Sequence, residues 1–170
     1  APPMPSSDPV QILLAHNHWA TRNVLDACAK LTDAQLDREF EMGLKTLRAT
    51  MTHVLGAMRG WGDLLAQRDQ PRQRLEAQGP FTPVQLLELL DEIGADILAS
   101  IENKPLDEQL SGERAGKTYT FTRGAVITHV TTHAMHHRAQ AINMLRHLGV
   151  DPLPPSSVME WVFMVDTRSS

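Results

Sequence analysis

Residues 44–65 read LKTLRATMTHVLGAMRGWGDLL and carry the most regular hydrophobic pattern of the chain. The apolar side chains recur at alternating spacings of three and four residues, at Leu44, Leu47, Met51, Val54, Met58, Trp61 and Leu65. This spacing places them on one face of an α-helix, and such a stripe is typical of a helix that packs in a bundle. The pattern predicts a helix here, with its apolar face turned toward other helices.

Two further amphipathic helices are predicted on either side of this stretch. The first begins at Asp8 as N-cap with Pro9 at its first position, and Gln11 follows three residues after the cap. Asn17 lies on its apolar seam, which is formed by Val10, Leu13, Leu14, Ala20, Val24, Cys28 and Leu31. After a polar linker, residues 67–79, Thr82 begins another helix whose inward positions are Leu86, Leu90, Ile93, Ile97 and Ile101.

The rest of the chain predicts smaller elements and a fourth helix. Residues 118–122 alternate as in a strand after the turn-forming pair 115–116, which predicts a small hairpin. A helix from about Gly124 to His147 follows, and a short last helix begins at Ser157. We therefore expect one all-α domain over residues 1–170: an antiparallel four-helix bundle with a hairpin before the fourth helix, and a flexible leader at residues 1–7.

Composition excludes several classes of function. The net charge is -4 and the basic residues are scattered, which argues against nucleic acid or an anionic membrane as a partner. No apolar run is long enough to span a membrane. The single cysteine, Cys28, permits no intramolecular disulfide and falls on an apolar seam, so we expect a core residue and a cytoplasmic protein.

Five of the eight histidines lie between His129 and His147. Side chains four residues apart on a helix converge, so both 129/133 and 133/137 are candidate metal-binding pairs. His133 and His137 interrupt the apolar seam of this helix, whereas His129 lies toward its flank. Burying imidazoles without partners would cost about 1–3 kcal/mol for each unpaired group. The alternative is that both are core histidines that bond to the backbone or to each other.

A third ligand is expected from the second helix. His53 lies beside its seam, and its helical neighbours are small: Ala49, Thr50, Gly56, Ala57 and Gly60. Small side chains leave room for an ion and a substrate, although they could equally serve close helix packing. The chain contains neither the Glu-x-x-His pairs of di-iron bundles nor the His-Glu-x-x-His motif of zincins.

Three blocks of sequence resemble the DinB/YfiT-like superfamily over nearly the whole chain. They are His16-Asn17-x-Trp19-Ala20, the block from Thr46-Leu47-Arg48 through His53 to Trp61, and His133-x-x-His136-His137-Arg138-x-Gln140, where Ala139 replaces a usual glycine. The resemblance implies an up-down-down-up four-helix bundle, often a homodimer, with a metal on His53, His133 and His137. Characterised relatives include thiol-dependent transferases and isomerases that use bacillithiol or mycothiol.

Three protein ligands leave one metal position open, as in catalytic sites. We expect a zinc or nickel ion, or iron, and an enzyme that transfers a low-molecular-weight thiol to an electrophile through a metal-bound thiolate. The alternatives are a hydrolase that uses metal-bound hydroxide and a non-catalytic, stress-related binding protein. Asn17, His129, His136 and Arg138 are candidates for contacts around the ligands, and Glu160 would join them if the last helix folded over the site.

Overall fold

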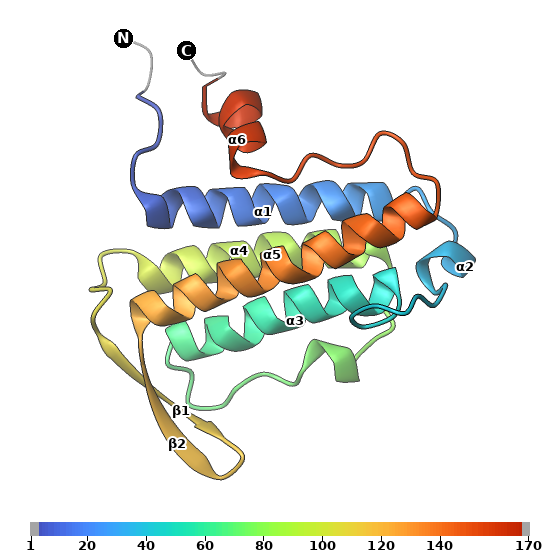
Figure 1. The fold of residues 1–170 in the computed structure, drawn as a ribbon. Coiled ribbons are helices and arrows are strands. Elements are labelled where there is room, and N and C mark those ends of the chain that lie inside the picture. Colours follow the sequence, from blue (N-terminus) through green and yellow to red (C-terminus); the bar gives the residue numbers. More distant parts are fainter. Residues whose placement is uncertain (1–3, 168–170) are drawn as a thin grey trace.

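The structure is a computed structural model that describes residues 4–167, and it is mostly helical with one small sheet (Figure 1). Among these residues four long helices lie side by side: α1 (Pro9–Cys28), α3 (Leu47–Leu65), α4 (Pro83–Ile101) and α5 (Arg123–His147). Short elements complete the fold: α2 (Asp33–Leu36), η1 (Leu75–Ala77), α6 (Val158–Trp161) and η2 (Val162–Asp166). The prediction of a mostly helical chain with a small hairpin is confirmed.

Hydrogen-bonded caps begin the long helices close to where the sequence predicts them. The Asp8 side chain accepts from the Val10 N–H at the start of α1, and Thr82 forms a reciprocal capping box with Gln85 at the start of α4. Two predicted ends were wrong. The stripe that begins at Leu44 becomes helical only at Leu47, because the Thr46 side chain caps α3 at that point. The second wrong end is that of α1: the predicted apolar seam continues to Leu31, but the helix ends at Cys28.

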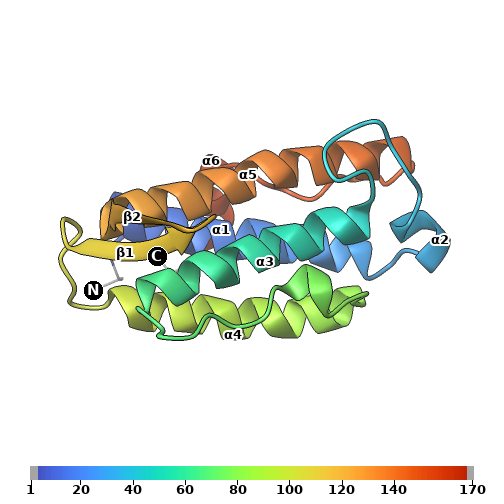
Figure 2. The same cartoon turned by 90° about the horizontal axis from the view of Figure 1, so that it is seen from below.

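The four long helices enclose one hydrophobic core. Helix α3 packs against α4 and α5, and α1 packs against the same two helices, so each helix has two neighbours (Figure 2). Leu25, Leu55, Leu90 and Leu145, one from each helix, are completely buried. Each such side chain contributes about 1.5–3 kcal/mol through its removal from water. This core fixes the spacing of α3 and α5, which carry the predicted metal ligands.

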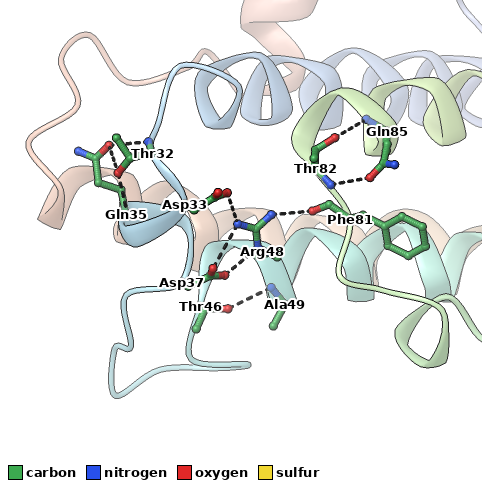
Figure 3. A network of polar contacts seen from close by, with 10 residues as sticks. All are labelled: Thr32, Asp33, Gln35, Asp37, Thr46, Arg48, Ala49, Phe81, Thr82 and Gln85. Carbon is green, nitrogen blue, oxygen red and sulfur yellow. Dashed lines mark hydrogen bonds and ion pairs between the residues drawn. The ribbon is translucent and has the colours of Figure 1, made fainter.

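A network around Arg48 joins the start of α3 to its neighbours (Figure 3). Its guanidinium donates to Asp33 and Asp37 at 2.7 Å each and to the Phe81 carbonyl at 2.8 Å. Only 13% of the Arg48 side chain is exposed, so these bonds are partly shielded from water. The network ties α2 and the N-terminal end of α4 to α3.

The predicted hairpin consists of β1 (Gln109–Arg114) and β2 (Lys117–Thr122), which pair in antiparallel fashion. Ala115 and Gly116 both have positive φ values, +52° and +74°, as a tight two-residue hairpin turn requires. The hairpin packs against α3 and the start of α5. At its base the buried Arg123 donates to the carbonyls of Leu65 and Ser100, which anchors it to α3 and α4.

The C-terminal segment crosses α1 on the side of the molecule away from α3 (Figure 1). Trp161 is buried there, whereas Phe163 is 68% exposed. Residues 1–3 of the predicted leader lie outside the described residues, and Ser6 bonds to the Asp166 carboxylate. Among the helices of residues 4–167, none combines the length and apolar character that crossing a membrane demands.

Candidate metal centre

His53 of α3 meets His133 and His137 of α5 between the two helices. Each offers a ring nitrogen, and these atoms all lie within 4.8 Å of one another. The Nε2 atoms of His53 and His133 are 3.2 Å apart, and the ring centroid of His137 lies 4.7 Å from that of His53. The structure therefore brings together the three residues that the sequence predicted as ligands.

Two of the three imidazoles have their Nδ1 atoms engaged by oxygen acceptors. Glu76, in η1, lies with Oε1 3.1 Å from His53 Nδ1, and Gln140 Oε1 lies 2.9 Å from His137 Nδ1. An oxygen acceptor at Nδ1 places the proton on that nitrogen and leaves the Nε2 lone pair free for a metal. The two contacts thus fix the tautomer that a ligand set requires.

The surroundings favour the neutral forms of His133 and His137. Burial, together with the neighbouring His137 and His53, lowers the pKa of His133 to about 4. Burial also lowers the pKa of His137, against the opposing effect of its bond to Gln140. Neutral imidazole is the form that binds transition metals, so both rings are ready to act as ligands near pH 7.

The donor geometry fits one divalent ion. Two nitrogens at 2.0–2.1 Å from a tetrahedral ion would be about 3.3 Å apart, close to the 3.2 Å between His53 and His133. An all-imidazole set suits zinc, nickel, iron and copper. His53, His133 and His137 can therefore hold such an ion, and three ligands leave its remaining side open to a small molecule.

The site adjoins a groove of about 1430 Å³. His53 and His133 line its inner end, and small residues of α3, including Gly56 and Gly60, line its floor. The hairpin and the α3–α4 connection contribute the other walls. A substrate could reach the open side of the ion through this groove.

The other predicted site residues divide into two groups. The ring of His129 lies 5.3 Å from that of His133, and the ring of His136 lies 5.0 Å from that of His137, so both flank the ligands. Asn17 and Arg138 instead face each other between α1 and α5, where Arg138 donates to Asn17 Oδ1 at 2.5 Å.

Arg138 is buried, and burial lowers its pKa to about 10. Its guanidinium bonds to Asn17 and Thr21 on α1, so it holds α5 against α1. Glu160 accepts from the backbone of Ser157 at the start of α6, which packs on α1. The last helix therefore packs on α1 and does not fold over the site, so Glu160 does not join the ligands.

Sequence reasoning missed Glu76 and the role of Gln140. Gln140 belongs to the motif that ends the histidine block, and its position three residues after His137 puts both on one helical face. Glu76 lies in the polar linker, 23 positions from His53, where no periodicity marks it. Its approach depends on Gly56, where a Cβ atom would come within 2.9 Å of the Glu76 carboxylate.

Comparison with known proteins identifies the family of the chain and a solved structure that shares its fold. The family model of the DinB family matches residues 6–160. The crystal structure of a DinB-like protein, YjoA, from Bacillus subtilis superposes with a TM-score of 0.61 at 15% identity, covering 85% of this chain and 96% of that one. Among curated proteins, none matches the chain. The likeness to the solved structure shows a shared fold, and the family match spans most of the sequence: the chain belongs to the DinB family.

Proposed function

We propose that the protein is a metal-dependent enzyme that transfers a low-molecular-weight thiol to an electrophile. The observation that carries the proposal is the convergence of His53, His133 and His137, of which His53 and His133 line a large groove. A divalent ion at this position would deprotonate a thiol or a water molecule on its open side and so supply a nucleophile near neutral pH. Zinc and nickel are the ions we expect, with iron as a further fit.

The protein's own residues would hold and orient the reactants. Glu76 and Gln140 hold His53 and His137 at their Nδ1 atoms, which leaves the Nε2 atom of each ring free for a metal. At Gly60 of α3, which lines the groove, a Cβ atom would meet nothing within 4 Å, so space for a substrate remains there. No protein nucleophile is needed, and burial raises the pKa of the Cys28 thiol to about 12, which removes it from that role.

A second candidate is a metal-dependent hydrolase. It is favoured by Glu76, because a carboxylate beside a ligand is the type of group that can take a proton from water. Glu76 is however engaged with His53 Nδ1, which suits a positioning role better than that of a general base. The thiol transferase therefore stands first, and a binding protein without turnover remains the outcome if both activities are absent.

The test begins with metal content. Elemental analysis of untagged protein should find about one ion per chain, lost in each of His53→Ala, His133→Ala and His137→Ala while the circular dichroism stays helical. The loaded protein is then assayed with thiol–electrophile pairs and, separately, with ester and amide substrates. Thiol consumption that requires the ion supports the transferase, and hydrolysis without thiol supports the second candidate. A wild type that remains metal-free after incubation with zinc and nickel would refute both.

We also propose a homodimer, which sedimentation velocity can test. The exposed Phe163 offers an apolar contact for a second copy.

A further inference from the structure

A row of aromatic rings leads along the groove away from the three histidines. The ring of His129, which neighbours His133, meets Trp61 edge-on with 4.9 Å between centroids. Trp61 meets Phe121 edge-on at 5.7 Å, and Phe121 lies nearly parallel to Tyr119 at 6.3 Å. Trp61, Phe121 and Tyr119, here named the aromatic row, all line the groove.

The hairpin holds two members of the row toward the groove. Tyr119 and Phe121 are two positions apart on β2, so their side chains leave the same face of the strand. Tyr119 pairs with Gly112 across the hairpin, and a Cβ atom at Gly112 would come within 3.1 Å of Leu64 on α3. This close approach seats the hairpin against α3. Tyr119 nevertheless stays 43% exposed, so the row is covered only in part by the protein itself.

The floor of the groove beside the row is kept open. Gly60 immediately precedes Trp61 on α3, and a Cβ atom added there would meet nothing within 4 Å. Glycine is less favourable than alanine inside a helix, and at Gly60 no close packing explains its presence. Gly60 also lines the groove, so its missing side chain leaves the groove open at this position.

The charges along the groove do not select an ion. Asp63 pairs with Arg68 at 2.9 Å, and Glu76 lies 3.7 Å from Arg74. The groove is lined by four acidic and three basic residues, so its charges nearly balance around the apolar and aromatic surface: Asp63, Asp69, Glu76, Glu113, Arg68, Arg74 and Arg114. Such a surface favours a flat, uncharged ligand.

We propose that the aromatic row binds a planar, uncharged aromatic ring, and that the electrophile of the thiol transfer belongs to this class. The second half of this statement rests on the proposed function, whereas the first concerns binding alone. The groove, at about 1430 Å³, exceeds the usual size of a small-molecule site and accommodates a ring and a thiol together. A ring on the row would place its substituent toward His129 and the ligands.

Binding can be tested with hydroxamates that share one metal-binding head. Acetohydroxamate, cyclohexanecarbohydroxamate and benzohydroxamate are titrated calorimetrically into zinc-loaded protein. The phenyl and cyclohexyl groups have similar size, so their difference reports on flatness and ring contacts. We expect benzohydroxamate to bind about three- to tenfold more tightly than its cyclohexyl analogue, the gain typical of an aromatic pair. Equal affinities would overturn the proposal.

Two variants locate the ring. Gly60→Leu adds a side chain to the groove that the aromatic row lines, so we expect it to lower benzohydroxamate affinity about tenfold and leave acetohydroxamate affinity unchanged. Phe121→Leu should also reduce the preference for the phenyl group, whereas Phe163→Leu, at an exposed phenylalanine after α6, is the matched control. If Gly60→Leu weakens neither ligand or both equally, the ring does not bind on the row.

A last titration separates this inference from the proposed function. Here 2-naphthol, which has a ring and no strong metal-binding head, is titrated into metal-free wild type and Gly60→Leu. If 2-naphthol binds the wild type and not Gly60→Leu, the aromatic row is supported. A failure of acetohydroxamate to bind zinc-loaded protein would count against the metal-based function and not against the aromatic row. Absence of 2-naphthol binding to the wild type would overturn the inference.

Discussion

Replacing Glu76 should weaken metal binding without unfolding the protein. Its carboxylate lies 3.1 Å from His53 Nδ1, and outer partners of metal-ligating histidines are worth about 10–100-fold in metal affinity. The exposed fractions of the two side chains are 25% for His53 and 32% for Glu76, so water screens their interaction in part. We therefore expect the lower end of that range, about tenfold, for Glu76→Ala. Glu76→Gln keeps an acceptor for the Nδ1 proton and loses the charge, so its loss should be smaller, about threefold.

The same contact can be disturbed without changing the carboxylate. A Cβ atom at Gly56 would lie 2.9 Å from Glu76 Oε2, so Gly56→Ala should push the carboxylate away from His53 and weaken metal binding several-fold. Gly60→Ala is the matched control, because its Cβ meets nothing within 4 Å. Both changes add about 1 kcal/mol of helix propensity to α3, so the difference between them isolates the position of Glu76.

Competition for zinc against a chromogenic chelator measures these affinities, with circular dichroism melting as the check on folding. Glu113→Ala removes another carboxylate that lines the same groove and controls for the change in net charge. The reasoning is refuted if Glu76→Ala loses no more affinity than Glu113→Ala while His53→Ala still abolishes binding. In that case the contact seen at His53 would contribute nothing to holding the metal.

Three further predictions concern groups away from Glu76. Burial raises the pKa of Cys28 to about 12 and leaves it 2% exposed, so iodoacetamide at pH 8 should label it only in denaturant, as mass spectrometry can show. Folding lowers the pKa of His133 from 6.5 to about 4, so between these pH values the unfolded chain binds a proton that the folded chain does not. The metal-free protein should therefore lose about 2 kcal/mol of stability, after allowance for solvent screening, as the pH falls through this window. Urea midpoints should show this loss in the wild type and much less of it in His133→Gln. Asn17→Ala removes an acceptor from the buried Arg138 and should cost about 2 kcal/mol in urea unfolding, whereas an unchanged midpoint would mean that water replaces the amide.

The sequence predicted the helices well because their ends are encoded locally. Asp8, Thr82 and Ser157 each cap the helix that begins after them, and the residues that complete these motifs lie within three positions. The hairpin was predicted for the same reason, since its turn needs two adjacent residues with positive φ. The apolar stripe misplaced the start of α3, because Leu44 fits the spacing but lies before the Thr46 cap and is 37% exposed.

The sequence predicted only the part of the candidate site that follows from positions along a helix, namely the three histidines. Helical spacing left two candidate pairs, 129/133 and 133/137, and the apolar seam favoured His133 with His137, while small neighbours drew attention to His53. The groove could not be predicted, since it depends on how the hairpin seats against α3 and on the path of the α3–α4 connection. Glu76 lies on that connection, and its contact with His53 arises from tertiary packing that no local pattern encodes.

The hydrogen-bond partners of the ring nitrogens help to decide whether these three residues are ordinary core histidines or metal ligands. Asn17 and Arg138 represent ordinary buried polar packing, because each finds its partner in the other. The histidines differ: the outer nitrogens of His53 and His137 are bonded, while their inner nitrogens converge with that of His133. If one of the Nε2 atoms of His53 and His133 carries a proton, the two can form a hydrogen bond with each other. The remaining nitrogen of His137 would then still lack a partner in this pair. One cation satisfies all three lone pairs at once, and the oxygen acceptors behind the rings favour the tautomers that it needs. The arrangement of acceptors, more than the clustering of the histidines, is what favours a metal centre over a hydrogen-bonded core.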